Sequence, residues 1–91
     1  MNGWKNYETW ACNLWLTNEE PVYRYWTAAA KETLKAENRD KTRAAYTLAE
    51  RIRDELEDGA PEIRASLYAD IMTAALQRID YIEVATAFLD E

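Results

Sequence analysis

Carboxylates are the side chains with which this sequence could do chemistry. Five of them lie close together around Gly59, namely Asp54, Glu55, Glu57, Asp58 and Glu62. A pair such as Asp54 and Glu57 can act as general acid and base only in a cleft that shifts the pKa of one of the two groups. The sequence shows no sign of such a cleft, and it therefore predicts a protein that is not an enzyme.

Histidine and cysteine, the other common reactive residues, are scarce. The chain has no histidine and one cysteine, Cys12, which excludes a Ser-His-Asp triad, a Cys-His pair and a Cys/His zinc site. Because no histidine can activate Cys12, we interpret it as a small core residue rather than a nucleophile. We therefore expect neither a cofactor nor a metal ion, and a fold held together by packing.

The distribution of charge favours a binding role for the acidic residues. The formal net charge is −6, and the whole excess falls in residues 51–91, which hold four Lys or Arg against ten Asp or Glu. Spaced carboxylates can imitate the phosphates of a nucleic acid and occupy a basic channel on a partner. They can equally serve only to keep a protein soluble, and both interpretations stay open. The negative charge argues against direct binding of nucleic acid.

Aromatic residues are concentrated at the opposite end of the chain. Seven of the eleven lie within the first 26 residues: Trp4, Tyr7, Trp10, Trp15, Tyr23, Tyr25 and Trp26. Such residues can stack on the bases of a single strand, but their helical spacing favours a core. Leu16 points away from the apolar stripe of its own helix, so Trp4, Leu16 and Tyr25 are an alternative, apolar surface for a partner.

Helices must position all of these residues. Apolar residues recur at intervals of three and four, and no segment alternates with the period of two that a strand requires. We therefore expect an all-α fold, a compact single domain over residues 1–91 with four to five short helices around an aromatic core. Helices are predicted over 7–17, 19–37, 41–58 and 81–89, with a further one opened by Pro61.

Helix ends and buried faces can also be predicted. Asn6 and Asp80 are expected to cap the first and last helices, and Gly59 to close the third in a left-handed conformation. The buried face of the first helix is predicted to consist of Tyr7, Trp10, Ala11, Leu14 and Trp15. The helix after Pro61 has the broadest apolar face, so we expect it to be the most buried.

Targeting and membrane segments are not evident. No stretch approaches the ~18 unbroken apolar residues of a membrane span, and the first five residues lack the apolar run of a signal peptide. We therefore expect a cytoplasmic protein without a membrane partner.

Several short motifs extend over most of the chain: Asn6-Tyr7-Glu8-Thr9-Trp10, Leu14-Trp15-Leu16 and Asn18-Glu19-Glu20, then Tyr68-Ala69-Asp70 and Ile79-Asp80-Tyr81. With these motifs the sequence resembles a family of small uncharacterised helical proteins encoded by phages and other mobile elements. The resemblance implies an accessory or host-interaction protein in the host cytoplasm, with no established chemistry.

Two functions fit these observations. The first is an inhibitor that binds a host protein or protein–nucleic-acid complex of a defence system, such as CRISPR or restriction, with the acidic residues around Gly59. The second is a small interaction or assembly module, either a homodimer or bound to another protein, that uses the aromatic N-terminal helices. The sequence does not choose between them.

Overall fold

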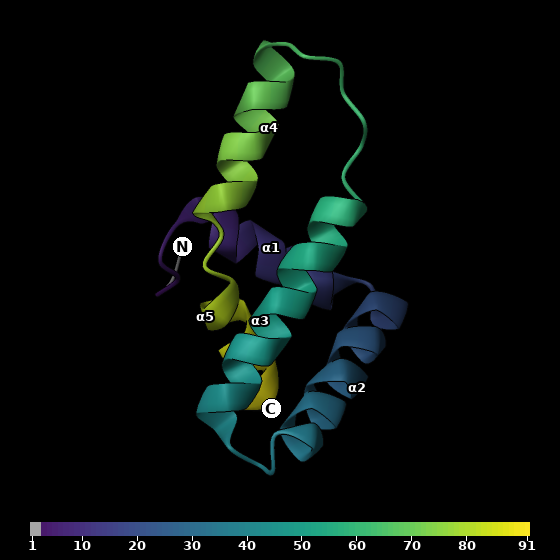
Figure 1. Cartoon of the computed structure of the whole chain (residues 1–91), viewed down its shortest axis with the longest axis vertical. Coiled ribbons are helices and arrows are strands. Elements are labelled where there is room, and N and C mark those ends of the chain that lie inside the picture. The colour runs from purple at the N-terminus through teal and green to yellow at the C-terminus, as the bar shows by residue number, and fades with distance from the viewer. Residues whose placement is uncertain (1–2) are drawn as a thin grey trace.

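A computed structural model describes residues 3–91, which form five helices and no strand (Figure 1). The helices are α1 (Tyr7–Asn18), α2 (Glu20–Ala36), α3 (Lys41–Asp58), α4 (Leu67–Arg78) and α5 (Tyr81–Leu89). The expected all-α class is therefore confirmed. Within this described range, no helix has both the length and the apolar character needed to cross a membrane.

The core lies where α2, α3 and α5 meet. Leu48 and Ile52 of α3 and Val84 of α5 are completely buried, and Trp26 of α2 and Phe88 of α5 are nearly so. Full burial of one such aliphatic side chain contributes about 1.5–3 kcal/mol. The remaining core residues are mostly alanines, which let the three helices approach closely: Ala29, Ala30, Ala44, Ala45, Ala49 and Ala85.

The caps predicted for the first and last helices are present. The Asn6 side chain accepts a hydrogen bond from the Thr9 amide at 2.9 Å, and the Asp80 side chain accepts one from the Glu83 amide at 3.1 Å. Each cap satisfies a backbone N–H that the helix itself leaves without a partner. These local signals were readable because a cap and its amide lie within three residues of each other.

The segment after α3 differs from the prediction in two ways. Gly59 ends α3 at φ −86° and ψ −4°, so the expected left-handed conformation is wrong. The helix predicted to open at Pro61 instead begins at Leu67, where the Ser66 hydroxyl accepts a hydrogen bond from the Ala69 amide at 3.2 Å. Ala60, which precedes Pro61, has no side-chain acceptor for such a cap.

The prediction that the fourth helix would be the most buried is also wrong. Every residue of α4 retains solvent exposure, and Leu67, Tyr68 and Ile71 are more than half exposed. Figure 1 shows α4 and the loop before it extending beyond the other helices, with α1 at the base of α4. The molecule is consequently elongated, 44 Å by 27 Å by 25 Å.

α1 turns a different face to the core than its sequence predicts. Thr9, Cys12 and Leu16 are buried, whereas Tyr7 and Trp15 are 58% and 66% exposed. Leu16, expected to point outwards, is only 6% exposed, so that expectation is wrong. α1 has apolar residues on both sides, and the buried side includes a threonine whose hydroxyl finds hydrogen-bond partners there.

Candidate functional site

An apolar hollow of about 350 Å³ lies between α1 and α4. Ala11, Trp15 and Leu16 line it from α1, and Leu56 lines it from the end of α3. The α4 side is formed by Met72, Ala75 and Leu76. Glu8 is the charged residue at its edge. This hollow exists because the apolar stripe of α4 faces α1 without closing on the end of α3.

A second apolar hollow, of about 400 Å³, lies on the other side of the end of α3. Leu16 and Leu56 line both hollows, so the two are adjacent. The second is completed by the start of α2, through Pro21, Val22 and Tyr25. We call the two hollows together the apolar groove. It extends from α4, past the C-terminal end of α3, to the start of α2.

Exposed aromatic rings border this groove. Trp15 is 66% exposed. The ring centroids of Tyr7 and Trp10 are 5.5 Å apart. Further along α4, Tyr68 and Ile71 add exposed apolar surface. Single exposed apolar residues are ordinary on proteins, but several of them beside an apolar hollow are typical of an interaction site.

Tyr25 is held in place at the α2 end of the groove. Its hydroxyl lies 2.8 Å from a Glu55 carboxylate oxygen and accepts a hydrogen bond from Arg51 at 3.1 Å. The Arg51 guanidinium also lies 5.4 Å from the Tyr25 ring centroid and 5.9 Å from that of Trp26. Hydrogen bonds to Tyr25 and Glu55 raise the pKa of Arg51 above its ordinary value. These contacts hold the Tyr25 side chain in place at this wall of the groove.

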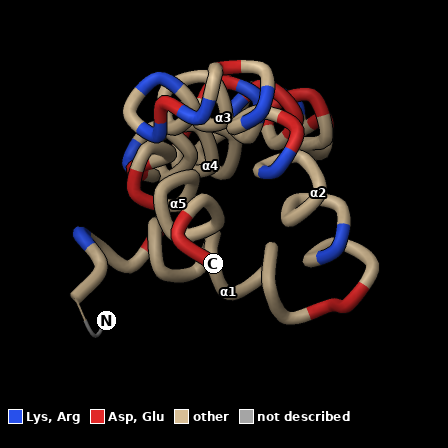
Figure 2. Tube along the Cα trace, turned by 90° about the horizontal axis from the view of Figure 1, so that it is seen from below, with Lys and Arg blue, Asp and Glu red and all other residues tan. Residues whose placement is uncertain are grey.

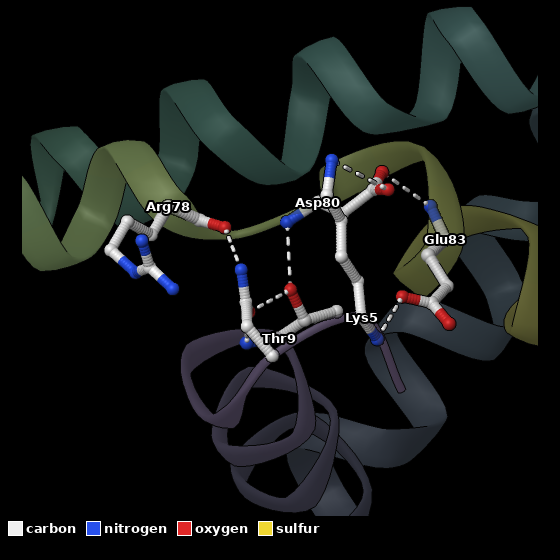
Figure 3. A network of polar contacts seen from close by, with 6 residues as sticks. Lys5, Thr9, Arg78, Asp80 and Glu83 are labelled. Atoms are coloured by element: carbon white, nitrogen blue, oxygen red, sulfur yellow. Dashed lines mark hydrogen bonds and ion pairs between the residues drawn. The ribbon is translucent and has the colours of Figure 1, made fainter. Parts of the chain in front are cut away.

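The base of α4 is tied to α1 by a polar network (Figure 3). The Thr9 hydroxyl donates to Asn6 Oδ1 at 2.6 Å and accepts from the Asp80 amide at 2.9 Å. The Asn6 side-chain amide donates to the Arg78 carbonyl at 2.8 Å, and the Arg78 side chain pairs with Glu8 at 3.3 Å. These contacts position α4 beside α1 and so set the width of the groove.

The predicted acidic surface lies next to the groove, at the C-terminal end of α3. Asp54, Glu55, Glu57, Asp58 and Glu62 are all exposed. Asp54 pairs with Arg53 at 3.3 Å and Glu55 with Arg51 at 3.0 Å. Over residues 3–91, no ion pair involves Glu57, Asp58 or Glu62. The charges along α3 contrast with α1, which is almost free of them (Figure 2).

This end of α3 is electrostatically unfavourable as it stands. The C-terminal end of a helix carries a partial negative charge. Each acidic residue placed there therefore lowers the stability of the folded protein by a few tenths of a kcal/mol up to about 1 kcal/mol. The last turn of α3 contains no basic residue that would offset this. A cation beside the groove would therefore be stabilised by both the side chains and the helix.

The alternative apolar surface predicted from the sequence is only partly assembled. Leu16 and Tyr25 line the same hollow. Trp4 lies elsewhere, beside Glu83 and Thr86 of α5, and packs against the core. Sequence reasoning missed Trp15 and the α4 residues as groove residues, because it assigned both stripes to the core. The sequence did contain a signal for the groove, because the apolar stripes of α1 and α4 together hold more apolar residues than one small core needs.

Cys12 lies at the bottom of the groove and is a core residue, as expected. Burial raises the pKa of its thiol from the ordinary value of 9.0 to about 12. The thiol is therefore protonated at neutral pH and is a poor nucleophile. In the described part of the chain, no group of His, Cys, Asp or Glu side chains is arranged to hold a metal ion.

Fold and site together define a small all-α protein with an open apolar groove beside its helical core. The chain belongs to DUF7249, a family of unknown function, whose model matches residues 1–87. No curated protein and no solved structure gave a significant match to this chain. Family membership therefore brings no activity with it, and inference about function rests on the geometry described above.

Proposed function

We propose that this protein is a non-enzymatic protein-binding module that takes an apolar segment of a partner into the groove between α1, α4 and the end of α3. The observation that carries this proposal is that Met72 and Leu76 of α4 are only half-buried and share an open apolar hollow with Trp15, which is 66% exposed. A monomer gains nothing from leaving this surface in water, because each buried aliphatic or aromatic side chain contributes about 1.5–3 kcal/mol.

The structure of α4 supports the same proposal. An isolated helix shorter than about 12–15 residues is only marginally stable in water. α4 has 12 residues and packs chiefly against α1. A partner that covers Leu67, Tyr68 and Ile71 would stabilise the helix from its open side.

The test is capture of partners by the tagged full-length protein, compared with two variants. Trp15→Ala removes a large exposed side chain from the groove, and Tyr46→Ala removes one of similar exposure from α3, outside the groove. We expect Trp15→Ala to lose a salt-resistant partner that wild type and Tyr46→Ala both retain. Identical capture by all three proteins would contradict the proposal.

A second candidate function rests on the carboxylates at the end of α3. We propose, as the alternative, an inhibitor encoded by a phage or another mobile element, which places these acids in a basic channel of a host nucleic-acid-handling complex in the cytoplasm. The exposed carboxylates of Glu57 and Asp58 support it, as does the resemblance of the motifs around Asn6 and Trp15 to proteins of mobile elements.

The alternative has its own test. Reversing Asp54, Glu57 and Asp58 to Lys should abolish capture of such a complex while far-UV circular dichroism stays unchanged. The complex captured by wild type should also elute when salt is raised, because exposed charges are screened. A partner that survives both the reversals and high salt would rule this candidate out.

A further inference from the structure

The protein has more surface than its mass requires. A folded monomer of 10.6 kDa is expected to expose about 5,500 Å², whereas this chain exposes 6455 Å². Its radius of gyration of 13.7 Å likewise exceeds the ~12 Å expected for 91 residues. The surplus of about 1,000 Å² is comparable with the ~800 Å² that each partner contributes to a stable interface.

The apolar groove is the feature of this surface that can accept a partner's chain. Its two hollows, of about 350 and 400 Å³, share Leu16 and Leu56 and so form one apolar surface rather than two separate sites. α1 and α4 form two walls of the groove. A helix that lies between them would pack as a third helix does when it is added to a pair. An amphipathic helix fits such a groove, because its apolar side chains recur on one face at i, i+3, i+4 and i+7.

The charge beside the groove selects among helices. Glu57 and Asp58 end α3 directly after Leu56, which lines both hollows, and Glu62 follows in the next loop; none of the three has an ion-pair partner within residues 3–91. A partner with Lys or Arg beside its apolar stripe would pair with them as it docks. A second copy of this chain would bring another charge of −6 and the same acidic end of α3, and like charges brought together across an interface are unfavourable.

We infer that the groove binds a basic amphipathic α-helix of a partner protein, with its apolar stripe against Trp15, Leu56 and Leu76 and its Lys or Arg side chains against Glu57, Asp58 and Glu62. This inference rests on the proposed protein-binding function and adds the chemistry of the partner. It gives the apolar groove and the acidic end of α3 one shared role.

The test uses three synthetic helical peptides of about 18 residues, each with the same leucine stripe and with flanking positions that are all Lys, all Gln or all Glu. Their affinity for the full-length protein is measured by isothermal titration calorimetry. We expect the Lys peptide to bind at least ~10-fold more tightly than the Gln peptide, and the Glu peptide to bind most weakly. A Lys peptide with serine in place of every leucine should not bind.

Three variants establish where the peptide binds. Trp15→Ala should weaken binding of the Lys peptide by ~10-fold or more, since large aromatic residues dominate interface energetics. Tyr46→Ala is the matched control and should leave the affinity unchanged. The double variant Glu57→Lys, Asp58→Lys should remove the preference for Lys over Gln. Circular dichroism of each variant verifies that it is folded.

The outcomes separate this inference from the function on which it rests. Equal, Trp15-dependent binding of the Lys and Gln peptides would overturn the basic partner but retain an apolar docking groove. Failure of every peptide to bind in a Trp15-dependent way would overturn both. A concentration-dependent dimer in analytical ultracentrifugation that Trp15→Ala dissociates would assign the groove to a second copy of the chain.

Discussion

The helices α3 and α5 differ from α1 and α4 in what they do with their apolar residues. α3 and α5 bury Leu48, Ile52 and Val84 completely. α4 carries an apolar stripe of comparable breadth, yet Leu67 and Ile71 of that stripe are more than half exposed. α1 is divided, with one face in the core and another, through Trp15, beside the groove.

This difference indicates that stability and recognition are located in separate parts of a very small protein. The α2, α3 and α5 core supplies most of the buried side chains, and α4 supplies none of them, so most of the stabilising packing lies outside α4. α4 can then expose apolar residues at little cost to the fold. Substitutions in the core should therefore lower the free energy of unfolding. Substitutions in α4 should change that free energy little and weaken binding instead.

The largest expected effect is on the core. Leu48→Ala should lower the free energy of unfolding by about 2–5 kcal/mol, because it removes buried methyl groups and leaves a cavity. A protein of this size has a total stability of the order of 5–14 kcal/mol, so much of it would be lost. Urea denaturation measures the change. A loss below about 1 kcal/mol would show that the core is not where the stability lies.

A smaller effect is expected where the two regions are joined. Thr9→Val preserves the shape of the side chain but leaves the Asp80 amide without its acceptor, which should cost about 1–3 kcal/mol. Hydrogen exchange at the Asp80 amide should accelerate as well. Thr73→Val, on the exposed side of α4, is the control and should change neither quantity.

Alkaline pH tests burial at the bottom of the groove. The pKa of Cys12 is about 12 in the folded protein and close to its ordinary value of 9.0 in the unfolded chain. The Cys12 thiol therefore stays protonated to a higher pH in the folded protein than in the unfolded chain. Its contribution to the free energy of unfolding is fully present below pH 9 and is lost as the pH rises towards 12. At pH 10 the loss should be about 1 kcal/mol.

Cys12→Ala separates this effect from other alkaline titrations, because it removes the thiol and keeps the helix. Tyr81, whose pKa burial raises to about 12, contributes to the remaining pH dependence. If wild type and Cys12→Ala lose stability equally between pH 8 and 10, the thiol is not buried as described.

The smallest effect on stability is expected in α4. Ile71→Ser should change the free energy of unfolding by less than about 0.5 kcal/mol, because Ile71 is already 56% exposed. The same variant should weaken binding of the basic helical peptide, because Ile71 directly precedes Met72, which lines the groove. A large loss of stability would instead place α4 within the cooperative core and remove the contrast between the two regions.

Much of the fold could be predicted from the sequence, but less of the candidate site. The stripe of α3, with Leu48 and Ile52, was unambiguous because that helix has a single apolar face. The caps Asn6 and Asp80 were found because they act on neighbouring residues. The groove was not found, since it depends on Trp15 and Leu76, which are distant in the sequence and meet only through the packing of α1 against α4.

The sequence by itself determined the five helices, most of their ends and the negative charge of the second half, because these follow from spacing, capping and composition over a few residues. Only the tertiary structure decided which apolar faces would be covered. Periodicity shows which residues share a face, but the choice of face depends on distant partners: the buried face of α1 holds Leu16 and also Thr9, whose hydroxyl accepts from the Asp80 amide 71 residues further along the chain.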